Sequence, residues 1–585
     1  MVDPSRGLLP MKSELPTALA PRQPLVAELR SQLATAVPGV DDYLRAWADW
    51  SLGLALAPER QQALFQSALA HGADNLRFAL QAAAGKAMPA ESDDAAFAGA
   101  GWQDWPFNVY AHTFQNLNDW SGEVLAAADG VSAENAQRLE FLRRQWLNLA
   151  SPAHYLPTNP QLLEQTRTEG GANLLRGAQH WVEDLARTLA GGAAPGTENF
   201  RVGAQVAVTP GKVVMRNELA ELIQYTPQTD SVYAEPILVT PAWIMKYYIL
   251  DLSPHNSLVN YLVGQGHTVF MLSWKNPTAA DRNRSMDDYV RLGFRAALDA
   301  VQAIVPGRRV HTVGYCIGGT LLSIAAAALA REGDTRIASI TLFAAQTDFS
   351  EPGELSLFIS PGQLAALEAQ MQRDGVLSSE SMGAAFALLR PGELIWAPAV
   401  NQYLRGQRAP LSDLMAWNAD GTRMPCRMHS EYLERLYLHN ELAAGRFTVE
   451  GRAIDLRDLT MPMFVVGTET DHVAPWRSAF KTRALTRSGD YTFLLTSGGH
   501  NAGIISGPVN AKRRHRVYRW SDAGEAASPE QYLADAQLHA GSWWPTWQQW
   551  LVAHSAPGLV APPPQGNSAA GYVPLADAPG GYVRG

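Results

Sequence analysis

The sequence predicts an α/β protein: a largely parallel sheet covered by helices, with a helical region before it and a helical insertion within it. Through residues 41–195 apolar side chains recur at three- and four-residue spacing, which is typical of amphipathic helices. After residue 196 short β-branched runs alternate with helical stretches, and this alternation indicates parallel strands joined by crossover helices. Between about residues 350 and 459 the alternation gives way to helical spacing and then resumes, so we interpret this stretch as an inserted cap.

The composition excludes several classes of protein. The chain has 585 residues, of which 46% are hydrophobic and 18% charged, so it can bury a large core and is neither disordered nor collagen-like. A formal net charge of -9 without long basic runs argues against binding to nucleic acid. Two cysteines exclude a disulfide scaffold and any site with several thiolate ligands. The sequence has neither metal-ligand spacing nor a phosphate-binding loop, so we expect no metal and no cofactor.

Composition also sets the expected domain boundaries. The proline-containing residues 1–40 are expected to form a mobile arm. Residues 191–196, rich in Gly and Ala, are expected to link a mainly helical domain at 41–195 to a second domain at 196–555. Residues 556–585 are rich in Pro and Gly and are expected to be a poorly ordered tail. The sequence has no signal peptide and no stretch of about 18 apolar residues, so we expect a reduced, cytoplasmic protein without a membrane span.

The expected strands and helices follow one another in a regular order. The strands are short, apolar and mostly β-branched, and we place them at 213–215, 237–240, 268–272, 310–313, 337–343, 463–466 and 491–495. The helices between them are placed at 257–263, 286–304 and 320–331, with Ser285 and Asp288 resembling a capping box. Right-handed crossovers bring the loops after parallel strands to one edge of the sheet, where we expect the functional site.

The strongest functional signal is the segment 314–319, which lies between a β-branched strand and an Ala-rich helix. Its sequence, Gly-Tyr-Cys-Ile-Gly-Gly, is typical of a nucleophile elbow with cysteine in place of serine. A nucleophile on so sharp a turn needs small neighbours two positions away, and the N-terminus of the following helix favours a thiolate. We therefore expect Cys316 to be the nucleophile; the alternative is a buried structural cysteine. Cys426 lacks this strand–turn–helix context and is expected to be structural.

Two downstream residues are candidates for the acid and the base that a nucleophile requires. Asp471 and His500 each lie in the loop after an expected strand, and they follow Cys316 in the order nucleophile, acid, histidine. The sequence therefore predicts a triad of Cys316, Asp471 and His500 at one edge of the sheet. Either partner alone could be structural, Asp471 as a helix cap and His500 as a surface residue. His472 is the alternative base and Glu469 the alternative acid.

A triad of this kind also needs hydrogen-bond donors for an oxyanion. One donor is expected to be the backbone N–H of Ile317, and the second a backbone N–H near Trp243 or Ile244. The loop 240–246 that carries the second donor could instead be an ordinary connection. A cysteine nucleophile suits a thioester substrate, because the acyl-enzyme is again a thioester and stays activated for transfer to a hydroxyl. The basic run at 512–516 could pair with the phosphates of a CoA carrier or form a solvated face.

Together with these motifs, several segments resemble those of polyhydroxyalkanoate synthases, most closely of the class I type. The segments at 314–319, 471–476 and 497–500 are similar to the family's lipase-like box, acid motif and histidine motif. Further similar segments are 209–214, 246–252, 273–277 and 417–420 and, in the helical domain, 151–153, 159–160 and 170–174. The likeness begins at about residue 116, and the combined set is highly specific. Ala242 and Met245 depart from the family pattern, beside the expected second oxyanion donor.

The resemblance implies an α/β-hydrolase core with an inserted cap and an N-terminal helical domain. It also implies an (R)-3-hydroxyacyl-CoA substrate, expected to be 3-hydroxybutyryl-CoA, a polyester product and release of CoA. A homodimer that resides on polyester granules in the cytoplasm is implied as well. Two alternatives stay open: an α/β-hydrolase that acts as a thioesterase, esterase or polyhydroxyalkanoate depolymerase, and a non-enzymatic granule-coat protein. Whether Asp471 assists hydroxyl activation directly, and whether the polymer grows through covalent intermediates alone, is also left open.

Overall fold

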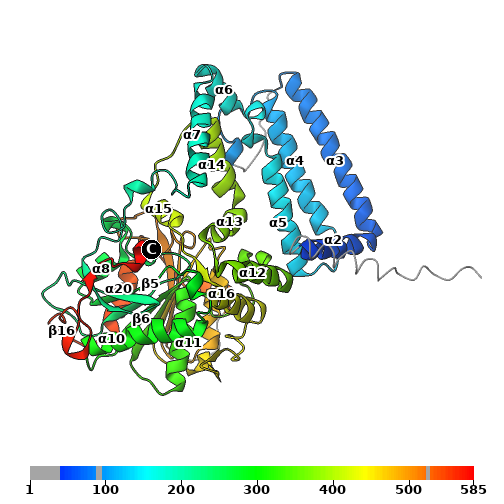
Figure 1. Ribbon diagram of the computed structural model, residues 1–585. Coiled ribbons are helices and arrows are strands. Elements are labelled where there is room, and N and C mark those ends of the chain that lie inside the picture. Colours follow the sequence, from blue (N-terminus) through cyan, green and yellow to red (C-terminus); the bar gives the residue numbers. More distant parts are fainter. Residues whose placement is uncertain (1–39, 87–94, 522–527) are drawn as a thin grey trace, which may run out of the picture.

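Among the described residues, an 11-stranded sheet forms the centre of the larger body of the molecule (Figure 1). The computed structural model describes residues 40–86, 95–521 and 528–585. Of the arm expected at residues 1–40, all but residue 40 lies outside the described residues. In chain order the strands are β1 (Gly211–Arg216), β2 (Ala220–Tyr225), β4 (Ile237–Thr240), β5 (Val269–Trp274), β6 (Val310–Tyr315), β7 (Ile337–Phe343), β12 (Met463–Thr468), β13 (Tyr491–Thr496), β14 (Arg514–Trp520), β15 (Gln537–Ala540) and β17 (Ala576–Asp577). Across the sheet their order is β15-β14-β13-β12-β7-β6-β4-β5-β2-β1-β17.

The middle of this sheet is parallel, as expected. Strand β4 pairs in parallel with β5 and β6, and the parallel pairing continues through β7, β12 and β13. The six parallel strands, together with β1, correspond to the seven strands expected from the sequence, which are thereby confirmed. Strands β2, β14, β15 and β17 extend the sheet by antiparallel pairing and were not expected. Strand β2 buries the polar side chains of Glu221 and Gln224, and β14 contains part of the basic run, so neither has the apolar pattern from which strands are predicted.

Helices cover both faces of the sheet. Successive residues of each strand point to opposite faces, so the apolar strands form a separate core with the helices on each side. On one face the core includes Leu238 and is covered by α10 and α11; on the other it includes Ile237 and is covered by α8 and α20. The helices around the sheet are α8 (Leu258–Gly264), α9 (Met286–Asp288), the π-helix η8 (Tyr289–Arg295), α10 (Ala296–Ile304), α11 (Ile317–Arg331), α17 (Trp476–Phe480), α18 (Thr482–Leu485), α19 (Pro529–Asp535) and α20 (Trp544–Ala553). The three helices expected here are confirmed, and Ser285 and Asp288 form the expected capping box.

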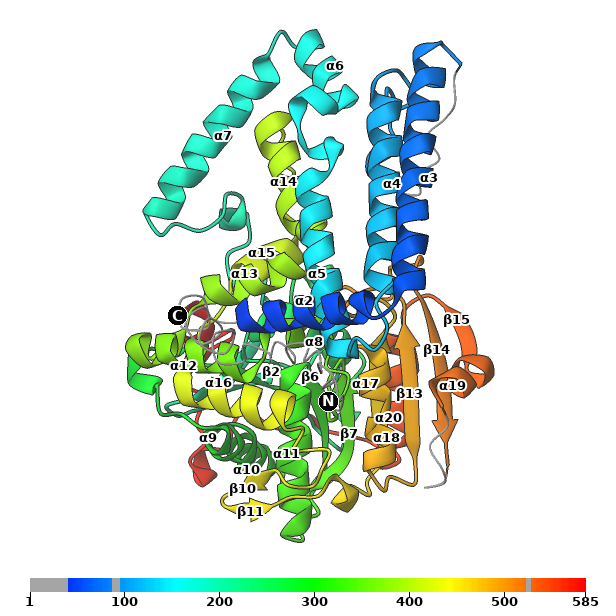
Figure 2. The same cartoon turned by 90° about the vertical axis from the view of Figure 1, so that its right-hand side faces the viewer.

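A second set of helices, before the sheet in sequence, stands apart from it (Figures 1 and 2). These are α2 (Val40–Ala55), α3 (Pro58–Ala83), α4 (Phe107–Ala126), α5 (Ala133–Ala150), α6 (Pro160–Thr168) and α7 (Ala172–Leu189). Helices α3 and α4 run side by side, and α2 lies across their ends nearest the sheet. Residues 191–196 after α7 contain neither helix nor strand. In the described parts of the chain no helix is both long and apolar enough to cross a membrane.

The insertion between β7 and β12 is mainly helical and connects the two bodies. Its principal helices are α12 (Pro361–Asp374), α13 (Ser379–Leu389), α15 (Asp413–Ala419) and α16 (Cys426–Tyr432), with the π-helices η10 (Gly392–Trp396), η11 (Val400–Leu404) and η12 (Leu433–Leu438). Helix η11 packs against α7, and Arg144 of α5 forms an ion pair of 2.9 Å with Glu354. The cap expected from the sequence therefore also carries contacts to the N-terminal helices.

The C-terminal segment departs from expectation, because residues 556–585 are not a poorly ordered tail. Strand β17 pairs with β1 and becomes the edge of the sheet, and Val583 is only 1% exposed in the core that contains Ile237. A high content of Pro and Gly lowers the propensity for regular structure, but it does not prevent order where the backbone groups find fixed partners. Here those partners lie on β1 and β2 and on Lys246.

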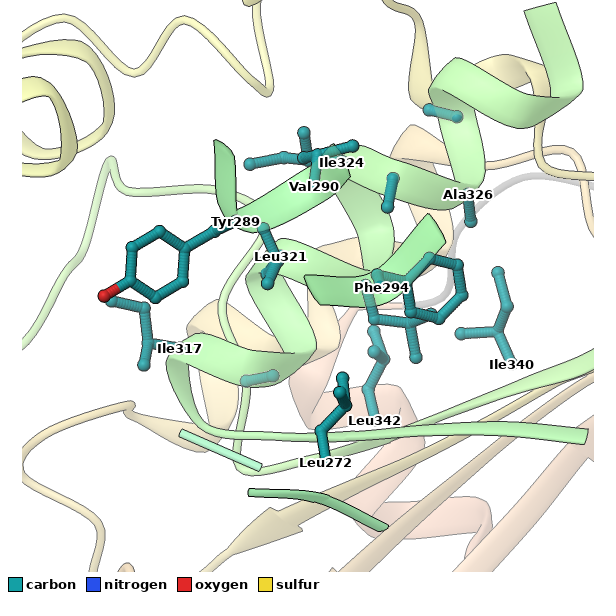
Figure 3. Close-up of a cluster of buried hydrophobic side chains, with 14 of the residues drawn as sticks. Leu272, Tyr289, Val290, Phe294, Ile317, Leu321, Ile324, Ala326, Ile340 and Leu342 are labelled. Carbon is teal, nitrogen blue, oxygen red and sulfur yellow. The ribbon is translucent and has the colours of Figure 1, made fainter. Parts of the chain in front are cut away.

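The core under α11 generates a prediction about stability. Figure 3 shows Leu321 and Ile324 of α11 in one buried cluster with Val290 and Phe294 of η8 and with Ile340 and Leu342 of the sheet. Leu321 is completely buried, so Leu321→Ala should lower the free energy of unfolding by about 3 kcal/mol through lost burial and a residual cavity. Leu189→Ala is the matched control, because Leu189 is 81% exposed and its truncation should change stability by less than about 0.5 kcal/mol. Urea unfolding of both variants tests this, and equal effects would contradict the packing described.

Candidate active site

The turn between β6 and α11 has the geometry of a nucleophile elbow. Cys316 is its apex, with φ 54° and ψ -129°, a conformation that residues other than glycine rarely adopt. Its backbone N–H donates a hydrogen bond of 2.9 Å to the carbonyl of Phe343 on the neighbouring strand. The side chain thus projects at the carboxyl edge of the parallel strands, directly before the N-terminus of α11. That position exposes the sulfur to the positive end of the helix dipole.

The glycines around Cys316 are required by close backbone contacts. A Cβ added to Gly314 would lie 2.4 Å from the Cα of Gly319. A Cβ added to Gly318 would lie 2.3 Å from the carbonyl oxygen of Thr240, at the start of the loop after β4. The second contact shows that this loop packs directly on the first turn of α11. The elbow and the loop therefore form one unit.

Asp471 and His500 lie in the loops after β12 and β13, and their side chains meet. His500 Nδ1 is 2.8 Å from Asp471 Oδ2. Thr468 Oγ1 donates to the same oxygen at 3.0 Å, while the backbone N–H groups of Val473 and Ala474 donate to Oδ1 at 2.9 and 2.8 Å. The Asp471 side chain is fully buried, yet both of its oxygens are satisfied. The carboxylate is thus held in one orientation and faces the imidazole.

Electrostatics strengthen this pairing and extend it to the thiol. Burial tends to raise the pKa of Asp471, but His500 and the two backbone donors lower it, so the pKa lies below its ordinary value. Burial alone would lower the pKa of His500; Asp471 and Cys316, through charge and hydrogen bonding, outweigh it and raise the pKa well above its ordinary value. Since Nδ1 faces Asp471, the other ring nitrogen is the one available to Cys316. The structure therefore pairs His500 with Asp471 and places His500 and Cys316 on the lining of one cavity.

Of the alternatives considered for these roles, His472 borders the cavity of Cys316, whereas Glu469 and Cys426 do not. Glu469 accepts a hydrogen bond of 3.1 Å from Arg514 and does not face His500. Cys426 begins α16, outside the cavity described below, and burial raises its pKa. His472 borders the same cavity as Cys316, but burial and the charge of Arg390 lower its pKa. Of these three, only His472 is near the thiol.

Cys316 and His500 open into a single cavity of about 620 Å³ that lies between the sheet edge and the insertion. Its lining is mostly apolar and includes Ala242, Ile244, Met245, Ile317, Leu355, Met382, Phe386, Leu394, Trp417, Tyr432, Tyr437 and Val473. An apolar cavity with a few converging polar groups is the usual form of a small-molecule site. Its shape depends on the insertion, which supplies Phe386 and Trp417.

The candidate oxyanion donors border this cavity as well. Ile317 begins α11 next to Cys316, and Ile244 lines the cavity from the loop 240–246. The Trp243 side chain turns into the core, where its ring lies 4.6 Å from that of Tyr289. Gly318 touches Thr240 and Pro241, so the loop that carries Trp243 and Ile244 packs against the first turn of α11, which carries Ile317. Of the two candidates in this loop, Ile244 lines the cavity.

Two tyrosines beside Cys316 were not found from the sequence. Tyr432 Oη donates to Tyr437 Oη at 3.4 Å, both residues line the cavity, and the nearby Cys316 adds to the effect of burial in raising both pKa values. Tyr432 ends α16 and Tyr437 lies in the π-helix η12 that follows it, where the wider turn brings residues five apart closer to one face than in an α-helix. Sequence periodicity does not reveal a π-helix, so this pair carried no signal.

The basic run at 512–516 has a structural role at the same site. None of its residues lines the cavity. Arg513 instead donates hydrogen bonds to the carbonyls of Ser497 (3.1 Å) and Ala502 (2.7 Å), on either side of His500. Arg514 pairs with Glu469 at 3.1 Å. Arg513 is thus turned inward and holds the His500 loop, while Lys512 and Arg514 are exposed, as a solvated face would have them. Pairing of the run with the phosphates of CoA stays a prediction.

The contact at Gly318 predicts a loss of stability on substitution. In Gly318→Ala the new methyl group meets the carbonyl oxygens of Thr240 and Pro241 at 2.3 and 2.5 Å, so the loop or the helix must shift. We expect the free energy of unfolding to fall by about 1–3 kcal/mol. Gly72→Ala on α3 is the control, because nothing lies within 4 Å of the added Cβ and alanine should raise helix stability by about 1 kcal/mol. Thermal unfolding of both variants measures the difference; a stable Gly318→Ala variant would contradict the contact.

The Asp471–His500 pair predicts a pH-dependent contribution to stability. A carboxyl group whose pKa is lowered by folding stabilises the fold at pH values above the ordinary pKa of Asp. An imidazole whose pKa is raised by folding stabilises it at pH values below the ordinary pKa of His. Both contributions are therefore fully present between about pH 4 and 6.5. Asp471→Asn should therefore lower the free energy of unfolding by about 3 kcal/mol in that range. The deficit should shrink as the pH rises through the raised pKa of His500.

Denaturant unfolding at pH 5, 7 and 9 would measure this deficit. Asp455→Asn provides the control, because the ion pair of Asp455 with Arg457 is exposed and its loss should change stability by less than about 1 kcal/mol at every pH. A deficit in Asp471→Asn that does not depend on pH would contradict the ion pair.

Comparisons with known proteins agree with this geometry. The family described as "Poly-beta-hydroxybutyrate polymerase (PhaC) N-terminus" matches residues 93–262, and the "alpha/beta hydrolase fold" family matches residues 235–505. A poly(3-hydroxyalkanoate) polymerase of Methylorubrum extorquens is 40% identical over 499 residues, which cover 84% of this chain and 80% of the relative. Polymerase subunits PhaC of Rhizobium meliloti and Cupriavidus necator are 37% and 38% identical, over 86% and 84% of this chain and 82% and 83% of their own lengths.

The resemblance drawn from the sequence motifs is thereby confirmed, as are the α/β-hydrolase fold and the helical region before it. The relatives are aligned over most of their own lengths, so the similarity is not limited to the fold of the sheet domain. The chain therefore belongs to the family of poly(3-hydroxyalkanoate) polymerases and is an enzyme of the acyltransferase type.

Proposed function

We propose that this enzyme polymerises (R)-3-hydroxyacyl-CoA, with 3-hydroxybutyryl-CoA as the preferred substrate, into polyester with release of CoA. The observation that carries the proposal is the 2.8 Å pair of His500 Nδ1 with Asp471 Oδ2, together with the position of His500 and Cys316 on one apolar cavity. This constellation activates a thiol. The family of the chain supports a polyester as the product.

In the first step the acyl group moves from CoA to the enzyme. His500 removes the proton from Cys316, and the thiolate attacks the thioester carbonyl of the substrate. The N–H of Ile317 and one from Trp243 or Ile244 stabilise the oxyanion. The bond from the carbonyl carbon to the CoA sulfur then breaks, and CoA leaves with the proton that His500 had taken. Because one thioester replaces another, the acyl group stays activated.

In the second step the acyl group moves from Cys316 to the 3-hydroxyl group of another hydroxyacyl unit. His500, oriented by Asp471, removes the proton of the 3-hydroxyl at the end of another hydroxyacyl unit. The resulting oxygen nucleophile attacks the acyl group on Cys316, an ester bond forms, and the Cys316 thiolate leaves and regains the proton. Conversion of a thioester into an ester drives the reaction forward. The apolar lining of the cavity supports this assignment, since it suits acyl chains and disfavours water.

We also propose that the enzyme acts as a homodimer at polyester granules in the cytoplasm. The N-terminal helices expose large apolar side chains that a polar solvent does not favour. On α7 these are Leu175, Trp181, Val182, Leu185 and Leu189, which are 70%, 53%, 57%, 42% and 81% exposed. Exposed apolar groups of this kind support contact with another protein or an apolar surface.

CoA release tests the proposed nucleophile. With (R)-3-hydroxybutyryl-CoA the wild-type protein should release CoA and produce turbidity, whereas Cys316→Ala should lower the rate of CoA release by about 10⁴-fold or more. Cys426→Ala is the matched control, since the second cysteine lies outside the cavity and its rate should stay within about twofold of wild type.

The same assay separates the alternative functions. Soluble 3-hydroxybutyrate as the sole product would show a hydrolase of the same fold, because water would then be the acceptor. CoA release that is absent in the wild-type protein would show a non-enzymatic granule protein. An unchanged rate in Cys316→Ala would show that another group is the nucleophile.

A further inference from the structure

Lys246 is a buried lysine at the end of the loop that borders the thiol. Its side chain is only 5% exposed, and Nζ lies 3.5 Å from Asp420. Its nearest partners come from the far end of the sequence: Nζ donates to the backbone oxygens of Val583 at 2.7 Å and Gly585 at 2.8 Å. Burial lowers the pKa of Lys246, while Asp420 favours its charged form. A buried ammonium group is unfavourable unless its donors are satisfied, so these oxygens are structurally important to it.

The segment 580–585 that supplies these oxygens is itself held in place by a buried carboxylate. Glu221 on β2 is 0% exposed and accepts hydrogen bonds of 3.0 Å from the N–H groups of Gly581 and Tyr582. A Cβ added to Gly580 would lie 2.4 Å from a carboxylate oxygen of Glu221, so only glycine allows this approach. The segment is therefore a fixed partner for Lys246, and we call residues 580–585 the clamp.

The loop 240–246 is held by side chains along its whole length. Three of its carbonyls accept hydrogen bonds from outside the loop: Pro241 from Trp274 Nε1 at 2.9 Å, Trp243 from Thr422 Oγ1 at 2.6 Å, and Lys246 from Trp417 Nε1 at 2.7 Å. Gly318 packs on its start. The Lys246 side chain adds the attachment at its end, immediately after Ile244 and Met245, which line the cavity.

We propose that Lys246 is a positioning residue for the loop 240–246, and that the clamp of residues 580–585 holds the Lys246 side chain in place. The inference rests on the proposed function, because the loop affects the reaction only through the oxyanion donor at Trp243 or Ile244. Such a donor stabilises the transition state when it lies at hydrogen-bond distance from the oxyanion, and a displacement of a few tenths of an ångström weakens it. Loss of the clamp contact therefore slows acylation and leaves substrate binding largely unchanged.

Steady-state kinetics of CoA release from (R)-3-hydroxybutyryl-CoA test this role. Lys246→Met keeps the length and apolar stem of the side chain but removes the ammonium group. We expect kcat to fall about tenfold and KM to change by less than about twofold. The matched control is Lys275→Met, because Lys275 also pairs with a carboxylate, Asp281 at 3.0 Å, in the loop after the neighbouring strand β5. Its kinetic constants should stay within about twofold of wild type.

A double-variant comparison separates the clamp contact from general loss of stability. Deletion of residues 583–585 removes both oxygens that accept from Lys246 and leaves the N–H groups of Gly581 and Tyr582 on Glu221. It should lower kcat as Lys246→Met does, and the two changes together should lower it little further, because both break the Lys246 contact. Hydrogen exchange of the amides in residues 240–248 should be faster in both variants and unchanged in Lys275→Met. This second measurement does not depend on catalysis.

The outcomes distinguish the inference from the function on which it rests. A Lys246→Met variant with wild-type kcat overturns the positioning role, whether or not exchange is faster. Effects on kcat that multiply in the double variant overturn the clamp. Wild-type protein that releases no CoA overturns the proposed function and this inference together, and Cys316→Ala with wild-type kcat overturns the nucleophile alone.

Discussion

The whole site depends on one backbone constraint, the positive φ of Cys316 between β6 and α11. A residue other than glycine in this conformation carries strain of about 1–3 kcal/mol, which persists only where the surroundings over-determine it. Here the surroundings are the hydrophobic core itself: residues 317–329 of α11 are buried, and the glycines beside Cys316 let β4 and the helix touch. The stability of the core thus holds the turn in shape, and the turn directs the sulfur into the cavity.

A second constraint acts on the charged partners of Cys316. Asp471 is a fully buried carboxylate, which would be unfavourable without donors, and four groups satisfy it. The His500 loop is fixed from its other side by Arg513 and, further on, by the indole of Trp543, which donates to the carbonyl of Gly503. The residues that we propose as acid and base therefore occupy fixed positions, as preorganisation for acyl transfer requires.

Much of the fold and most of the site could be predicted from the sequence. Strands such as β6 and β12 are apolar and β-branched, so local pattern finds them, and the elbow is recognised because its glycines are sterically required. Strand β2, which lies between β5 and β1, was missed because Glu221 is buried in it, and the clamp that satisfies Glu221 is hundreds of residues away. The ordered C-terminal segment was missed for the same reason. The pair Tyr432 and Tyr437 depends on a π-helix, which leaves no trace in residue spacing.

The order in which the site's parts occur along the chain has a consequence for biosynthesis. A ribosome delivers Cys316 well before the insertion, and the His500 loop emerges only after the insertion is complete. Throughout that interval the nascent polypeptide holds a thiol without its base, and β1 lacks its last partner, β17. The thiol that we propose as the nucleophile can therefore meet its histidine only after most of the chain has been made.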